Sequence, residues 1–118
     1  MIDFMINMHS WKIAAVEPEE SGIEGMHGYT DYTNHMILIN NKLEETEMEG
    51  VIIHEVTHAY RWSHGFVSDV DNPKLCIAEI EEMVANFIES FGRQIISKSK
   101  ELFIELKKEI KHGKNKGA

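Results

Sequence analysis

The chain has 118 residues, 42% of them hydrophobic and 27% charged, which is the balance of one folded domain rather than of a disordered segment. Its formal net charge of −8 disfavours direct binding of nucleic acid, because an acidic surface repels the phosphate backbone. No apolar stretch approaches the roughly 20 residues of a membrane span. The start has no basic signal region, and the single cysteine suits a reducing compartment, so we expect a cytoplasmic protein without membrane contact.

Short strands are predicted in the first third of the chain. Residues 11–16 and 29–33 have strand-like composition, and residues 17–28 between them are rich in Glu, Gly and Pro, as a loop would be. Residues 35–39 form the clearest strand, which ends at two turn-forming asparagines. We expect a small antiparallel sheet with 35–39 as an edge strand beside the functional site, where it could hold an extended peptide by backbone hydrogen bonds.

A helix is predicted after the last strand. Thr46 and Glu49 have the spacing of a capping box, which marks a helix start. An apolar periodic run continues to Trp62, and Gly65 is a plausible terminator.

Two more helices are predicted in the second half. Asn72 followed by Pro73 suits a helix start, and apolar residues recur at helical spacing up to Gly92, where we expect the helix to bend or end. Residues 95–110 repeat the pattern. The fold class is therefore α+β, with a small antiparallel sheet packed by three helices, in a single domain spanning residues 1–118 whose tail, 113–118, is frayed.

The first predicted helix carries the motif His54-Glu55-Val56-Thr57-His58, which matches H-E-x-x-H. Residues four apart on a helix lie one above the other, so His54 and His58 can bind one zinc ion. Glu55 lies between them and can act as general base, taking a proton from the attacking water. The motif residues fall on one face of the helix and an apolar set falls on the other, which argues against a surface helix with two incidental histidines.

A catalytic zinc usually takes a third protein ligand. His64 has the spacing of a longer motif, but Arg61 stands where that motif needs glycine for a sharp turn. Glu79, Glu81 and Glu82 on the next helix are the alternatives. Glu82 is favoured because Asn86, one turn later, could hydrogen-bond a ligand histidine.

The segment HEVTHAYRWSHGF, followed about twenty residues later by EEMVANFIESFG, resembles the ImmA/IrrE family of metallopeptidases, in particular its short phage and mobile-element type. The upstream segment GYTDYTNHMILINNKL resembles the strand region of that family. The resemblance implies a zincin-like fold with zinc held by His54, His58 and Glu82. It also implies cleavage of a repressor-type regulator, although we expect no attached DNA-binding domain.

These features predict a zinc-dependent endopeptidase acting on a protein or peptide, with Glu55 as the catalytic residue. The alternative is a non-catalytic protein in which the metal stabilises the fold and which acts by binding a regulator. A closed four-ligand zinc site would favour that alternative. A zinc hydrolase of a non-peptide substrate is a weaker third hypothesis.

Overall fold

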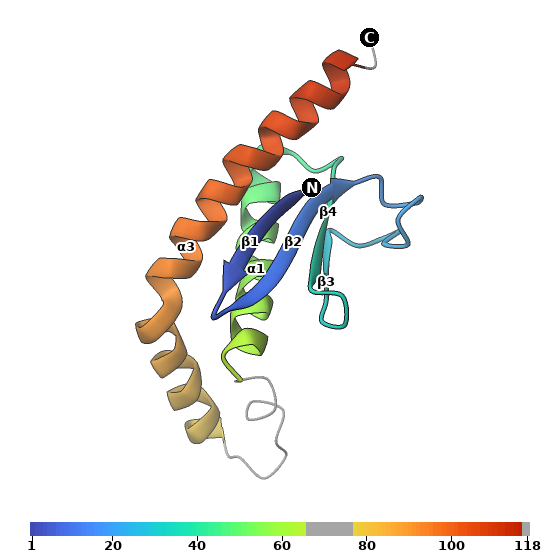
Figure 1. The fold of residues 1–118 in the computed structure, drawn as a ribbon. Coiled ribbons are helices and arrows are strands. Elements are labelled where there is room, and N and C mark those ends of the chain that lie inside the picture. Colours follow the sequence, from blue (N-terminus) through green and yellow to red (C-terminus); the bar gives the residue numbers. More distant parts are fainter. Residues whose placement is uncertain (66–76, 117–118) are drawn as a thin grey trace.

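The computed structural model describes residues 1–65 and 77–116 of the chain. Strands come first and helices follow, as predicted for an α+β fold (Figure 1). None of the helices in the described part of the chain is long and apolar enough to cross a membrane. The elements in chain order are β1 (Ile2–Ile6), β2 (His9–Val16), β3 (Gly28–Asp31), β4 (Met36–Asn40), α1 (Glu45–Ser63) and α3 (Ile77–Lys116).

The four strands form one sheet in the order β1-β2-β4-β3. Two hairpins, β1–β2 and β3–β4, are antiparallel, but β2 and β4 pair in parallel with Ile13 opposite Ile37. The prediction of an antiparallel sheet is thus wrong at its centre, because the chain passes through edge strand β3 before it returns to pair β4 with β2. The prediction that residues 35–39 form an edge strand is also wrong, since β4 has a neighbour on each side.

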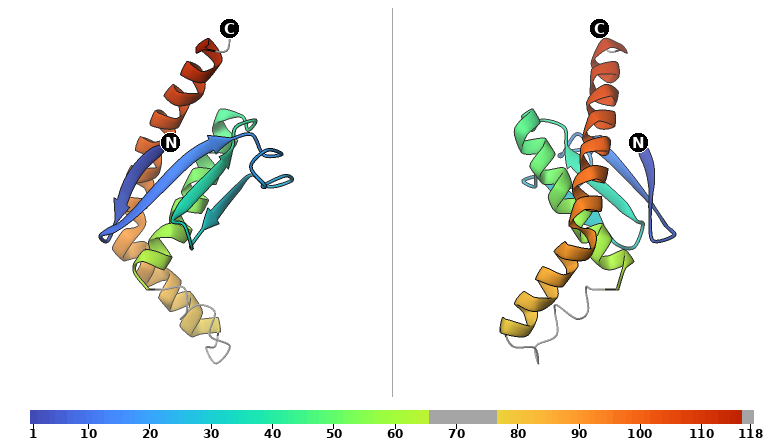
Figure 2. Two further views of the ribbon diagram at one scale, coloured as in Figure 1. Left: turned by 45° about the vertical axis from the view of Figure 1, so that its right-hand side comes forward. Right: turned by 90° about the vertical axis from the view of Figure 1, so that its left-hand side faces the viewer.

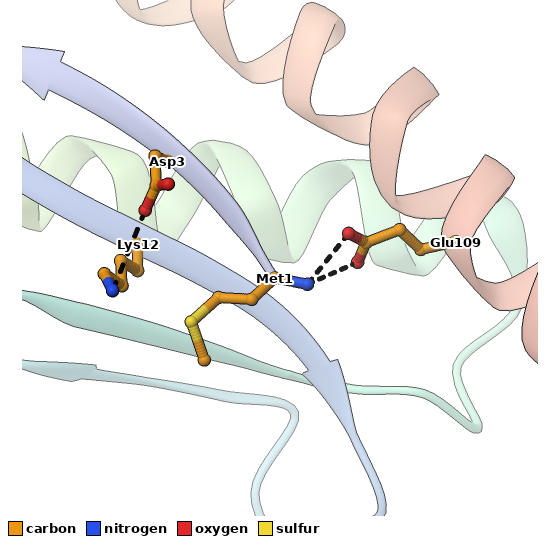
Figure 3. A network of polar contacts seen from close by, with 4 residues as sticks. All are labelled: Met1, Asp3, Lys12 and Glu109. Atoms are coloured by element: carbon orange, nitrogen blue, oxygen red, sulfur yellow. Dashed lines mark hydrogen bonds and ion pairs between the residues drawn. The ribbon is translucent and has the colours of Figure 1, made fainter.

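Strand β1 was not predicted. It is joined to β2 by a tight turn in which Asn7 and Met8 have positive φ angles of 46° and 66°. The amide of Asn7 also donates a hydrogen bond of 2.9 Å to the carbonyl of Ser63 at the end of α1. At the other end of β1, the Met1 amino group lies 2.8 Å from a carboxylate oxygen of Glu109 on α3 (Figure 3).

Both helices pack on the same face of the sheet, with α1 over β3 and β4 and α3 over β1 and β2 (Figure 2). Alternate strand residues point to this face, because successive side chains of a strand face opposite ways. The opposite face is open and carries exposed residues such as Asp3, Met5 and Lys12. The side chains that are wholly buried in the core include Trp11, Ile13, Ile37, Ile39, Ile52, Val56 and Leu106.

The predicted end of the first helix is confirmed, but its predicted cap is not. Gly65 follows the helix with φ of +77°, and its N–H donates to the carbonyl of Trp62 at 3.1 Å. At the start, Glu44 is the N-cap residue and makes no side-chain capping bond, so Thr46 lies inside the first turn and forms no capping box.

The second and third predicted helices are one continuous helix, α3, which passes through Gly92. A glycine inside a helix costs only about 1 kcal/mol, which the packing of a long helix easily outweighs. The helix start predicted at Asn72 and Pro73 lies outside the described residues. Helices α1 and α3 run antiparallel, since Lys107 reaches Glu45 at the start of α1 and Phe91 contacts His64 at its end.

Candidate metal centre

Helix α1 brings together three side chains that could hold a metal ion. One ligand atom each from His54, Glu55 and His58 lies within 4.8 Å of the others. The Nε2 atoms of the two histidines are 3.2 Å apart. Two nitrogens bound to one tetrahedral zinc at 2.0–2.1 Å are separated by about 3.3 Å. The separation of the two Nε2 atoms therefore suits a shared metal ion.

Burial confirms the predicted division of α1 into two faces for the two histidines but not for Glu55, which is buried. Ile52, Val56 and Ala59 are fully buried on the core face, while His54 is exposed and His58 half-buried. Tyr60 belongs to the core as well, and its burial raises the pKa of the phenol above 10. The histidines thus face solvent on a helix that the core fixes firmly in place.

The surroundings of His58 favour the neutral imidazole, which is the form that binds metals. Partial burial lowers the pKa of His58 below its ordinary value of 6.5. The charges of His54 and Arg61 lower this pKa further, while the carboxylate of Glu55 opposes them.

Glu55 is 6% exposed, so this residue lies in a more enclosed position than the two histidines. The hydroxyl of Thr30, on β3, is 3.1 Å from Oε1 of Glu55 and 3.3 Å from its backbone carbonyl oxygen. Thr30 is itself buried. This contact fixes the carboxylate between α1 and the sheet, and sequence reasoning missed it because the two residues are 25 positions apart with no motif linking them.

Strand β3 approaches α1 closely because residue 28 is a glycine. A methyl group there would lie 2.8 Å from Cγ1 of Val51 and 3.0 Å from Cγ of Glu55. Beside this contact runs an open groove of about 580 Å³, which is lined from β3 and the preceding loop by Gly25, His27 and Gly28, and from α1 by Glu47, His54 and Glu55.

We expect Gly28→Ala to destabilise the fold by about 1–3 kcal/mol, because the added methyl group overpacks the contact between β3 and α1. Gly50→Ala is the matched control, since a methyl group there has no atom within 4 Å and the site is an exposed helix position. That change should stabilise by roughly 0.5–1 kcal/mol. Denaturant titration measures both. Equal stability of Gly28→Ala and wild type would contradict the close approach.

The candidates for the third ligand lie apart from the cluster. Glu79, Glu81 and Glu82 are exposed on the first turns of α3. Glu82 precedes Phe91 by nine residues, and the ring of Phe91 lies 4.1 Å from that of His64, which follows α1 directly. At 1.5 Å per residue, Glu82 is roughly 13 Å along α3 from this contact with the end of α1. Within the described residues, the cluster contains neither Glu82 nor His64.

His64 has a packing role in this arrangement. Its ring stacks on Tyr60 and contacts Phe91, so it closes the space between α1 and α3. Burial lowers the pKa of His64, and the nearby His9 acts in the same direction. These packing contacts explain the position of the His64 side chain without any role in metal binding.

A comparison with protein-family models gives a match for this chain. The model of the family described as "Putative metallopeptidase family (DUF6782)" matches residues 18–86. That span is more than half of the chain and contains β3, β4, α1 and the first turns of α3. No curated protein and no solved structure matches the chain.

Proposed function

The chain belongs to the metallopeptidase family whose model matches residues 18–86, and from that premise we propose that it is a zinc-dependent endopeptidase. The observation that carries the proposal is the cluster of His54, Glu55 and His58, with Nε2 atoms at a separation suited to one metal ion. The family itself supports peptidase activity, while zinc and the residue roles are our inference.

His54 and His58 would hold the zinc ion, with Glu82 as the proposed third ligand. When bound, zinc supplies a Lewis acid that polarises the scissile carbonyl and lowers the pKa of a water molecule. Glu55 is the general base, and its carboxylate accepts a proton from the attacking water. Thr30 holds that carboxylate by a hydrogen bond of 3.1 Å, so the base is positioned before the substrate arrives.

Strand β3 is suited to hold the substrate in an extended conformation. It is an edge strand, and the groove beside it reaches His54 and Glu55. The N–H of Asn40 donates to the carbonyl of His27, and hydrogen-bonded pairs alternate in an antiparallel ladder. The backbone groups of Gly28 and Thr30 therefore point to the free edge, where a peptide can add as a further strand.

We further propose that the substrate is a repressor-type regulator and that the fold is zincin-like. Both follow from the resemblance of HEVTHAYRWSHGF and EEMVANFIESFG to the ImmA/IrrE family. The proposal places the cleavage in a regulatory circuit, where removing a repressor switches genes on.

Purified protein should carry about one zinc per chain, as expected for an H-E-x-x-H site with one further ligand. His54→Ala should lose the metal, and His112→Ala, an exposed histidine on α3, is the matched control that should keep it. Cleavage of a repressor encoded nearby should stop on chelation and return on adding zinc. Elemental analysis that finds no zinc, even after incubation with the ion, would refute the proposal.

A further inference from the structure

Positive charge is concentrated at one end of this acidic protein. Residues 93–118 contain eight basic and three acidic residues, while residues 1–92 contain four basic and seventeen acidic ones. The C-terminal part of α3 extends beyond the sheet and α1 (Figure 1). An acidic partner would therefore be repelled by most of the molecule and attracted by this part of α3.

A groove of about 570 Å³ lies between this part of α3 and the start of α1. We call it the lysine groove. Its wall combines apolar side chains with a row of cations and one carboxylate, namely Leu43, Met48 and Ile104 together with Lys107, Lys108, Lys111 and Glu45. It reaches the first turn of α1, Glu45 to Met48, before the turns that carry His54 and His58.

The three lysines differ in their surroundings. Lys107 is held in place, since its Nζ lies 3.6 Å from Oε2 of Glu45 and 4.8 Å from the centre of the Phe103 ring. Lys108 and Lys111 are exposed and pair with no carboxylate among the side chains that the structure describes. Two cations are thus available to a ligand. So is the apolar wall of the groove, which includes Ile104 with an exposed fraction of 44%.

We propose that the lysine groove docks an acidic amphipathic segment of a partner protein. Carboxylates of the segment pair with Lys108 and Lys111, and its apolar side chains cover Ile104 and Leu43. Nucleic acid fits less well, because its phosphates gain nothing from the apolar wall and are repelled by the acidic remainder of the chain. A membrane surface fits less well because the groove is concave and runs between two helices.

This docking site would give the proposed peptidase its selectivity for one substrate protein. This part of the inference rests on the function proposed above. An edge strand binds a peptide through backbone groups, which all sequences share. Selection of one protein among many therefore needs contacts elsewhere, and a charged apolar groove at a distance from the metal supplies them.

The test measures binding of a fluorescent synthetic amphipathic peptide of glutamate and leucine to the Glu55→Gln protein, in which the peptide is not cleaved. Lys108→Glu and Lys111→Glu should each weaken binding about fivefold, and both together about 20-fold, since each exposed pair contributes modestly. Lys100→Glu, an exposed lysine of α3 outside the groove, is the matched control and should change binding less than twofold. Added salt should weaken binding by the wild-type groove.

The apolar contribution has its own pair of variants. Ile104→Asn should weaken binding about fivefold, while Ile96→Asn, which is 53% exposed on α3 but lies outside the lysine groove, should not. Equal effects of groove and control variants would overturn the proposal. So would displacement of the peptide by single-stranded DNA or by phosphatidylserine vesicles at similar concentrations. If the protein is an active peptidase but does not bind the peptide, the docking proposal fails and the proposed function stands. If the wild type binds the peptide but shows no proteolysis, the proposed function fails and the docking proposal stands.

Discussion

Replacing Glu55 by glutamine is expected to lower the rate of peptide cleavage about 10²–10⁴-fold, the usual contribution of a general acid–base group. Glutamine keeps the shape of the side chain but cannot accept the proton of the attacking water. It can still hydrogen-bond the Thr30 hydroxyl, which lies 3.1 Å from Oε1 in the wild type. Zinc content and stability should therefore remain close to those of the wild type.

The measurement is the length of a co-expressed repressor, followed alongside zinc content and thermal unfolding. Glu49→Gln, which removes an exposed carboxylate from the same helix, is the matched control and should leave cleavage unchanged. If wild type and Glu55→Gln relieve repression equally while the repressor stays intact, binding without cleavage is sufficient to relieve repression. That result would favour the non-catalytic hypothesis over the peptidase.

Local spacing made one part of the site predictable. Two histidines four residues apart must share a face of a helix, so His54 and His58 could be paired from the sequence. Helix geometry brings the two side chains together, and their rotamers then place the Nε2 atoms 3.2 Å apart. The contacts of Glu55 with Thr30 and Gly28 depend instead on how β3 packs across α1, and no local pattern encodes that packing.

The same distinction explains the outcome for the fold. Strand-like composition and flanking turn residues are local features of the sequence, and they predict β2, β3 and β4 close to their observed positions. The turn at Asn7 and Met8 lacks the glycine that normally marks such hairpins, so β1 was missed. Strand order could not be predicted from the sequence either, because the parallel pairing of β2 with β4 depends on long-range packing of the whole core.

Gly92 shows how tertiary packing outweighs a local signal. As a helix breaker it predicted a bend or an end, yet α3 continues because Phe87, Ile95 and Leu102 on either side of it are buried in the core. The continuity of α3 has a consequence for the metal centre. It places Glu82 on the first turns of α3, which extend past the end of α1 (Figure 1).

The second large effect that we expect is a loss of zinc affinity when the proposed third ligand is removed. Glu82→Ala should weaken zinc binding by more than the 10–100-fold that loss of an outer partner of a ligand usually costs. Glu79→Ala and His64→Ala should have much smaller effects, since His64 is occupied in packing on Phe91 and Tyr60. Zinc titration of the three variants measures the difference.

Ligation by Glu82 requires the first turns of α3 to move toward His54 and His58, because the structure places Glu82 outside their cluster. Zinc should therefore slow hydrogen exchange of backbone amides in residues 77–91 of the wild type but not of Glu82→Ala. The exposed Glu89, on the same helix, supplies the control variant Glu89→Ala, which should respond to zinc as the wild type does. Loss of zinc in His64→Ala would instead support the longer histidine motif. Full zinc affinity in all three variants would show that neither Glu82 nor His64 is a ligand.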